Sequence, residues 1–275
     1  GIDDNIFNDS DDPKEDVTLT VESHVLAVLR LGLNELLFTT GSDYVWFKEH
    51  ASERSSNATY AMRFNLSASR LKPYVGAAST RTRARSGAEI DTRARRTERL
   101  AVAGTSLSLT ERTAVTASAQ RDVSLFEDGE RFRGVELDDR LNSTGWTYSG
   151  GVRYSVTPFT TLSVNGVYRE ETFQQSHLRD ARSYAVTPVV EFSPEAVIRG
   201  SILAGYEVFV PEDPELAENR GVVFEGSLNW SIASMTLFDL SLGRKVDYSY
   251  EDSQPYYLQT GARLTVTQRL FGPVS

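Results

Sequence analysis

The sequence predicts an all-β protein, an antiparallel up-and-down transmembrane β-barrel of about fourteen strands with short periplasmic turns and long extracellular loops. Apolar and polar residues alternate with a period of two along almost the whole chain. The predicted strands, about 10 to 14 residues long, exceed the ~5 to 6 residues of most soluble sheets and match the ~9 to 11 needed to cross a bilayer at a tilt. Short and long connections alternate, which is typical of bacterial outer-membrane barrels.

Composition narrows the class of protein. The 275 residues contain no cysteine, carry a formal net charge of -9 and are 40% hydrophobic. The missing cysteine excludes a disulfide scaffold and any cysteine-ligated metal site. The mean hydropathy is -0.34, and no apolar run approaches the ~18 to 20 residues of a membrane helix, so a helical membrane protein is excluded. A barrel remains compatible, because alternating strands average to a polar value.

The predicted strands follow one another as hairpins, from residues 1–7 as the first strand to residues 255–270 as the last. Short turns are predicted near residues 30–35, 69–73, 110–113, 157–160, 193–196 and 232–234. Longer polar connections are predicted near residues 8–15, 48–56, 83–96, 126–145, 174–181, 210–220 and 247–254. Six short and seven long connections join fourteen strands, and this even number places both ends of the sheet on the short-turn side.

The segment 146–156 illustrates how each strand separates two faces. Trp146 and Tyr148 begin an apolar face that continues at every second residue, whereas the other face carries small polar residues and Arg153. The turn at 157–160 is too short for a crossover helix, so the next strand pairs antiparallel. The same hairpin of long strands recurs to the end of the chain, which predicts a single barrel domain over residues 1–275.

Two sets of side chains define the predicted pore. The polar face is expected to line the lumen with Glu22, His24, Arg63, Arg81, Arg83, Arg85, Arg153, Arg169, Glu191, Arg199, Glu225, Asp239 and Arg263. The apolar face is expected to carry an interfacial aromatic girdle of Tyr44, Trp46, Trp146, Tyr168, Tyr184, Phe192, Tyr206, Trp230 and Tyr256. A soluble β-sandwich also alternates, but long strands, aromatic strand ends and mid-strand charges favour the barrel.

Four segments occur in a characteristic order: GIDDNIF at 1–7, YSVTPFTTL at 154–162, FSPEA at 192–196 and GYE at 205–207. In them the chain resembles the outer-membrane beta-barrel porin type 2 family. The resemblance implies an outer-membrane location and a pore-like barrel, with some relatives associated with export of surface polysaccharide. It implies no agreed substrate and no catalytic residue. Phe271 is followed by GPVS rather than ending the chain, so the assembly signal is expected within residues 264–271 or in further strands.

Arginine is concentrated at one place. Seven arginines lie within residues 81–99, namely Arg81, Arg83, Arg85, Arg93, Arg95, Arg96 and Arg99. Guanidinium groups bind phosphate and carboxylate bidentately, so the cluster predicts either an anion-selective constriction or a docking surface for lipopolysaccharide or an acidic glycan. The alternative is a solvated loop with ion pairs to neighbouring acids. Aromatic residues are not interleaved with these arginines, so the cluster does not indicate nucleic-acid binding.

Two other charged segments have simpler interpretations. The acidic residues around Asp9 and Asp11 offer oxygen ligands for calcium, but they lack the glycine and glutamate of an EF-hand loop, so a solvated acidic loop is favoured. The loop at 126–145 has nearly balanced charges, which suggests internal salt bridges or a loop folded into the mouth of the barrel.

An enzymatic reading has little support. The chain has three histidines, His24, His50 and His177, and no hydrolase, zinc-protease or phosphate-loop motif. A barrel hydrolase built on His24 with Glu22 is the enzymatic alternative, but His24 as a plain lumen residue is favoured. No enzyme, cofactor or metal site is therefore predicted.

The predicted function is passive passage of small hydrophilic or charged solutes through the bacterial outer membrane. Fourteen strands should leave a narrow or partly plugged pore, because the interior of an eight-stranded barrel is filled by side chains and a sixteen-stranded barrel encloses an aqueous channel. The alternative is a structural anchor or export pore within a multiprotein surface assembly. Expected partners are outer-membrane lipid, lipopolysaccharide and proteins of such an assembly.

Overall fold

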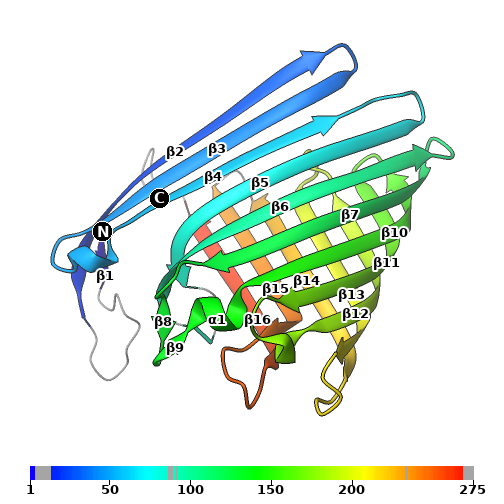
Figure 1. The fold of residues 1–275 in the computed structure, drawn as a ribbon. Coiled ribbons are helices and arrows are strands. Elements are labelled where there is room, and N and C mark those ends of the chain that lie inside the picture. The colour runs from blue at the N-terminus through cyan, green and yellow to red at the C-terminus, as the bar shows by residue number, and fades with distance from the viewer. Residues whose placement is uncertain (4–13, 86–88, 91, 233–234, 269–275) are drawn as a thin grey trace.

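The structure is a computed structural model that describes residues 1–3, 14–85, 89–90, 92–232 and 235–268. Antiparallel strands dominate it (Figure 1). They are β1 (Ile2–Asp3), β2 (Asp16–Leu31), β3 (Asn34–Phe47), β4 (Ser55–Asn65), β5 (Leu71–Arg85), β6 (Arg93–Ser108), β7 (Thr113–Phe126), β8 (Arg131–Phe132), β9 (Val135–Glu136), β10 (Ser143–Thr157), β11 (Thr160–Phe173), β12 (Ala181–Phe192), β13 (Ile198–Pro211), β14 (Asn219–Ile232), β15 (Thr236–Tyr248) and β16 (Tyr256–Gln268).

Helical structure is confined to the connections. It comprises the 3-10 turns η1 (Ala51–Glu53) and η2 (His177–Arg179) and the single-turn helix α1 (Leu137–Leu141). Among the described residues, no helix has the length and hydrophobicity needed to cross a membrane.

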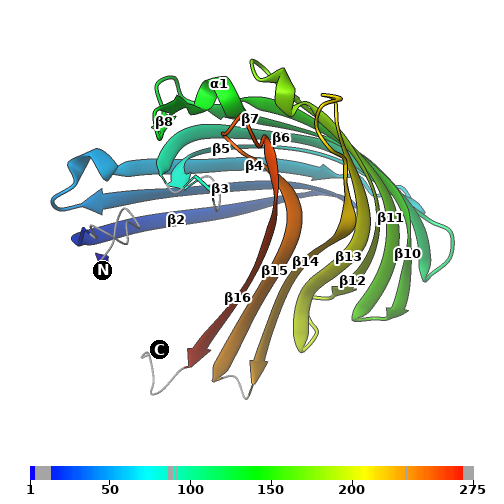
Figure 2. The same ribbon diagram turned by 90° about the horizontal axis from the view of Figure 1, so that it is seen from below.

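One sheet of fourteen strands contains every strand except β8 and β9, which form a separate two-stranded hairpin. Its strands lie side by side in chain order, and each is antiparallel to the next, with β7 pairing with β10. The all-β, up-and-down topology and the predicted strand number are confirmed. The sheet curls strongly, but its order ends at β1 on one side and at β16 on the other, so the described strands do not close into a ring (Figure 2).

The two ends of the strands differ as predicted. Tight hairpin turns join the strands at one end, here the turn end, and Gly32 with its φ of +66° lets β2 reverse into β3 within two residues. Long connections lie at the other end, the loop end, with α1 and the β8–β9 hairpin (Figure 1). One turn is displaced from its predicted place: the β4–β5 connection occupies residues 66–70 rather than 69–73, because Ala68 and Leu71 exchange backbone hydrogen bonds there.

The two faces of the sheet differ in chemistry. One face, here the outer face, exposes large apolar side chains such as Tyr148, Val152, Val164 and Val186. The other, the inner face, carries Ser, Thr, Asn and charged residues at the intervening positions. The buried apolar core is not between two layers, but forms one cluster on the inner side of the loop end. An exposed apolar belt on a curled sheet is what a lipid-facing wall requires.

Candidate functional site

Ten of the predicted lumen residues share the inner face. The antiparallel register places them on one face, out of phase with the exposed apolar residues. They are Glu22, His24, Arg63, Arg153, Arg169, Glu191, Arg199, Glu225, Asp239 and Arg263. Because side chains alternate strictly along a strand, this set follows directly from the period-2 pattern of the sequence.

Arg81, Arg83 and Arg85 need a correction. Arg81 pairs with Ala58 on β4 and with Thr97 on β6, in phase with the exposed Tyr60 and Val75. The register therefore puts these three arginines on the outer face at the loop end. The prediction that the three arginines share one face of the strand is confirmed. The predicted face is wrong, because an arginine within an alternating strand is expected to point away from lipid.

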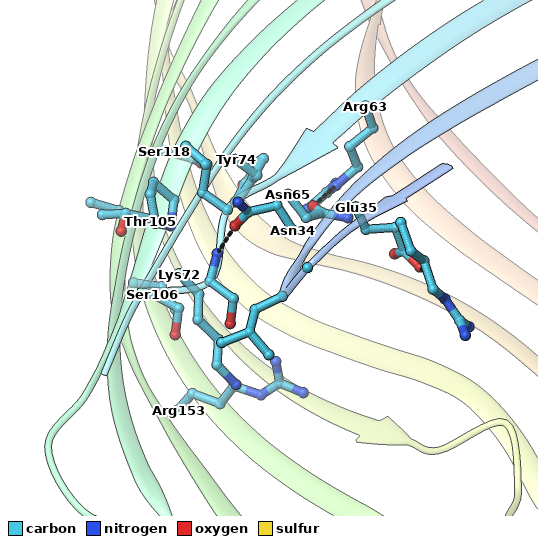
Figure 3. A pocket seen from close by; sticks show the side chains of 18 of the residues that line it. Asn34, Glu35, Arg63, Asn65, Lys72, Tyr74, Thr105, Ser106, Ser118 and Arg153 are labelled. Carbon is cyan, nitrogen blue, oxygen red and sulfur yellow. Dashed lines mark hydrogen bonds and ion pairs between the residues drawn. The ribbon is translucent and has the colours of Figure 1, made fainter. Parts of the chain in front are cut away.

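A cavity of about 780 Å³ lies on the inner face toward the turn end (Figure 3). Arg63 and Arg153 contribute guanidinium groups, and Lys72 adds an ammonium group. The Arg63 guanidinium lies 4.0 Å from the ring centroid of Tyr74, and its Nε donates to Asn65 Oδ1 at 2.9 Å. These contacts hold Arg63 against the wall while leaving it solvated.

Acidic groups only partly balance this cavity. Glu35 lies 3.9 Å from Arg30, and Glu191 Oε2 lies 3.2 Å from Arg153 Nη2. Four cations, on Arg30, Arg63, Lys72 and Arg153, therefore line the cavity together with one carboxylate, that of Glu35, and Glu191 pairs with Arg153 from the next strand but one. The local field is net positive, which favours anions in a water-filled passage.

A second inner cavity of about 750 Å³ has mixed charge. Its wall includes Arg169, Lys245 and Arg263 together with Glu207 and Glu225. Arg169 donates to Glu171 Oε2 from Nε at 3.1 Å and from Nη2 at 2.7 Å. Side chains of both signs therefore line one cavity, and fixed charges of both signs create a local field that orients polar molecules.

The loop end carries a hydrophobic cap, defined by Ile90, Ala94, Phe126, Leu137, Leu141, Phe173 and Tyr250. Leu137 and Leu141 from α1 are buried against strand ends of the inner face, and Phe132 packs edge-on against Tyr250 with ring centroids 5.0 Å apart. Phe132 belongs to the β7–β10 connection and Tyr250 to the β15–β16 connection, which lie far apart in the strand order. The cap therefore bridges the interior of the curled sheet.

Ion pairs fasten the cap. Arg179, whose side chain is fully buried, donates from Nε to the Ser249 carbonyl at 2.7 Å and from Nη1 to Asp252 Oδ1 at 3.0 Å. Arg140 reaches the other carboxylate oxygen of Asp252 at 2.7 Å, and Ser249 Oγ donates to Glu89 at 2.6 Å. Asp252 thus joins its own β15–β16 connection to the β11–β12 and β7–β10 connections. The charged loop at 126–145, expected either to pair internally or to fold into the mouth, does both.

A second group of polar contacts is centred on Asp16, the first residue of β2. The Asp16 carboxylate accepts backbone hydrogen bonds from Val17, Lys48, Glu49 and His50, and its Oδ2 lies 3.0 Å from His50 Nδ1. Desolvation by burial raises the pKa of Asp16, but hydrogen bonds from His50, Glu49 and Val17 outweigh it and hold the pKa well below its ordinary value. No local pattern in the sequence indicates this role for Asp16.

The aromatic residues gather near both strand ends. Tyr148, Tyr168 and Tyr184 form a row across three strands near the loop end, with ring centroids 6.2 and 5.2 Å apart. Trp146 stacks on Tyr148 at 6.1 Å. Trp230 stacks on Phe238 at 5.0 Å near the turn end. Of the remaining predicted girdle residues, Tyr44, Trp46, Phe192 and Tyr206 follow the outer-face register, whereas Tyr256 packs against the buried Phe209 at 5.0 Å.

The remaining histidine and acidic groups lie at separate places in the described part of the chain. His24 lies on the inner face beside Gly41, and Ser23 and Ser42 pair with each other on the opposite face at 2.9 Å. The carboxylates of Glu136, Asp138 and Asp139 lie within 4.8 Å of one another, and Arg131 neutralises Glu136. Asp9 and Asp11, the proposed calcium ligands, lie outside the described residues.

Comparison with known proteins gives one result. A family model described as "Putative beta-barrel porin 2" matches residues 1–274. No curated protein and no solved structure gives a significant match.

Proposed function

The chain belongs to the Putative beta-barrel porin 2 family, and we propose that it forms a bacterial outer-membrane channel for passive passage of small charged or hydrophilic solutes. The observation that carries this proposal is the division of one curled sheet into an exposed apolar outer face and an inner face that carries charged residues at mid-strand. Charged side chains in the middle of a membrane-spanning strand are tolerated where they face a water-filled lumen. The net positive charge around Arg63, Lys72 and Arg153 favours small anions.

Single-channel conductance in a planar bilayer, with the reversal potential under a salt gradient, tests the proposal. Wild type is expected to conduct with a preference for anions. Arg63→Gln combined with Arg153→Gln should move the reversal potential toward cations, because two of the cavity's positive charges are removed. Arg220→Gln is the matched control, since Arg220 lies on the outer face and pairs with Glu218.

A second candidate function rests on the cap. The cap joins the β5–β6, β7–β10, β11–β12 and β15–β16 connections into one packed surface at the loop end. Such a surface suits an anchor or export pore that opens only with partner proteins in a surface assembly. An inserted barrel that remains electrically silent would favour this candidate and contradict free passage.

A further inference from the structure

The arginines on the outer face form a patch that the proposed channel does not use. The patch comprises Arg81, Arg95, Arg99 and Arg121, all exposed, on β5, β6 and β7. Ser79 pairs with Arg99 and Arg81 with Thr97, so Arg81 and Arg99 are diagonal neighbours. Diagonal neighbours on one face lie about 7 to 8 Å apart.

The same diagonal relation extends the patch in both directions. Arg83 pairs with Arg95, which makes Arg95 a diagonal neighbour of Arg81. On the other side, Ala101 pairs with Arg121, which makes Arg121 a diagonal neighbour of Arg99. Four arginine residues therefore form a zigzag across three adjacent strands.

The protein balances little of this charge itself. Arg81 donates to Glu127 Oε1 from Nε at 3.1 Å and from Nη2 at 2.5 Å. Arg121 lies over the Trp146 ring, 5.9 Å from its centroid. Among the described residues, Arg95 and Arg99 have no ion-pair partner. Like charges this close repel one another unless an external anion lies between them.

An apolar groove of about 560 Å³ lies beside the patch on the outer face. Gly150 and Gly166 pair directly and form its floor, while Tyr148, Tyr168 and Tyr184 lie along it. Trp146 connects the two features, because it contacts Arg121 on one side and stacks on Tyr148 on the other. A cationic patch on the loop side of an apolar groove matches a lipid with an anionic head group.

We propose that this surface binds the phosphate groups of lipopolysaccharide in the outer leaflet, with Arg95, Arg99 and Arg121 on the phosphates and an acyl chain in the groove. The inference rests on the proposed membrane location. Guanidinium groups form paired hydrogen bonds with phosphate oxygens, and the loop end is the end that faces the outer leaflet in barrels of this topology. The lipid A phosphates are thereby placed on the loop side of the tyrosine row.

Binding is tested on the refolded full chain in detergent, by the rise in unfolding temperature on adding purified lipid A. Wild type is expected to be stabilised by lipid A and much less by the same lipid after removal of its phosphates. Arg99→Gln combined with Arg121→Gln should reduce the apparent affinity at least tenfold. Arg220→Gln, an exposed outer-face arginine outside the patch, should leave the affinity unchanged.

A separate variant tests the contribution of the groove to lipid A binding. A Cβ at Gly166 would meet its nearest described atom, the Gly150 carbonyl oxygen, at 3.9 Å, so Gly166→Leu fills the groove without a backbone clash. It should weaken lipid A binding while binding of a short phosphorylated head group without acyl chains stays as in wild type.

Equal binding of lipid A by wild type and the double arginine variant would overturn the inference, as would equal binding of the dephosphorylated lipid. A preference for phosphatidylglycerol over lipid A would also overturn it. Conductance is recorded separately on the same preparations. A silent barrel that still discriminates lipid A would remove the proposed passage function and leave this inference standing.

Discussion

At the residue scale, Asp16 shows how one carboxylate can organise a connection. Its side chain is fully buried and takes hydrogen bonds from three consecutive backbone N–H groups, those of Lys48, Glu49 and His50. An ionised acceptor makes stronger hydrogen bonds than a neutral one. The end of β3 is therefore held to the start of β2 by charge-assisted contacts rather than by apolar packing.

Asp16→Asn should lower the unfolding temperature by several degrees at neutral pH. Because the folded pKa lies below the ordinary value of about 3.9, the ionised carboxylate contributes stability above that value, and the contribution is lost as the pH falls through the folded pKa. The difference between variant and wild type should shrink below about pH 4. Thermal unfolding between pH 3 and 8 measures it, with the exposed neighbour Glu15→Gln as control. A constant difference at every pH would contradict a role for the charge.

At the element scale, β12 tests the assignment of the two faces. Val186 is 57% exposed on the outer face, whereas its neighbour Ala185 faces inward opposite Glu207. Val186→Arg should destabilise the inserted barrel by about 2 to 4 kcal/mol, the cost of a cation at the lipid midplane. Ala185→Arg should cost less than about 1 kcal/mol, because it adds a charge to a solvated wall. Denaturant unfolding in lipid vesicles gives both values, and equal costs would contradict the assignment.

Strands were far more predictable than connections. The alternation of Trp146, Tyr148 and Val152 against Arg153 specifies both the strand and its faces, because one residue of slip would exchange them. The face of Arg81 was predicted wrongly for a physical reason. The environment of an outer-face residue depends on how close it lies to the loop end of its strand, and the period-2 pattern carries no information about that position. Arg179 and Asp252 illustrate the other limit, since their contact spans 73 positions and no local pattern records it.

At the scale of the whole molecule, we expect the cap to limit how freely solutes reach the inner cavities. Leu137 is fully buried in it, and Leu137→Ala should destabilise the cap by about 2 to 4 kcal/mol through lost contacts and a residual void. The expected result is a larger or more frequent open state in single-channel recordings. Leu109→Ala is the control, because Leu109 is an exposed leucine in the β6–β7 turn. Unchanged conductance would show that the cap does not limit passage.

The direction of the two edge strands has a consequence for closure. β2 and β16 both run from the loop end to the turn end, so a ring that joined them directly would contain thirteen strands and one parallel seam. Bacterial single-chain barrels contain an even number of antiparallel strands. β1 supplies the missing direction: its pairing of Ile2 with Val17 is continued by the hydrogen bonds that Gly1 and Thr18 exchange. If the sheet closes into a barrel, the position beside β2 that β1 begins to fill would be its seam, because an antiparallel strand there would meet β16 in the correct direction.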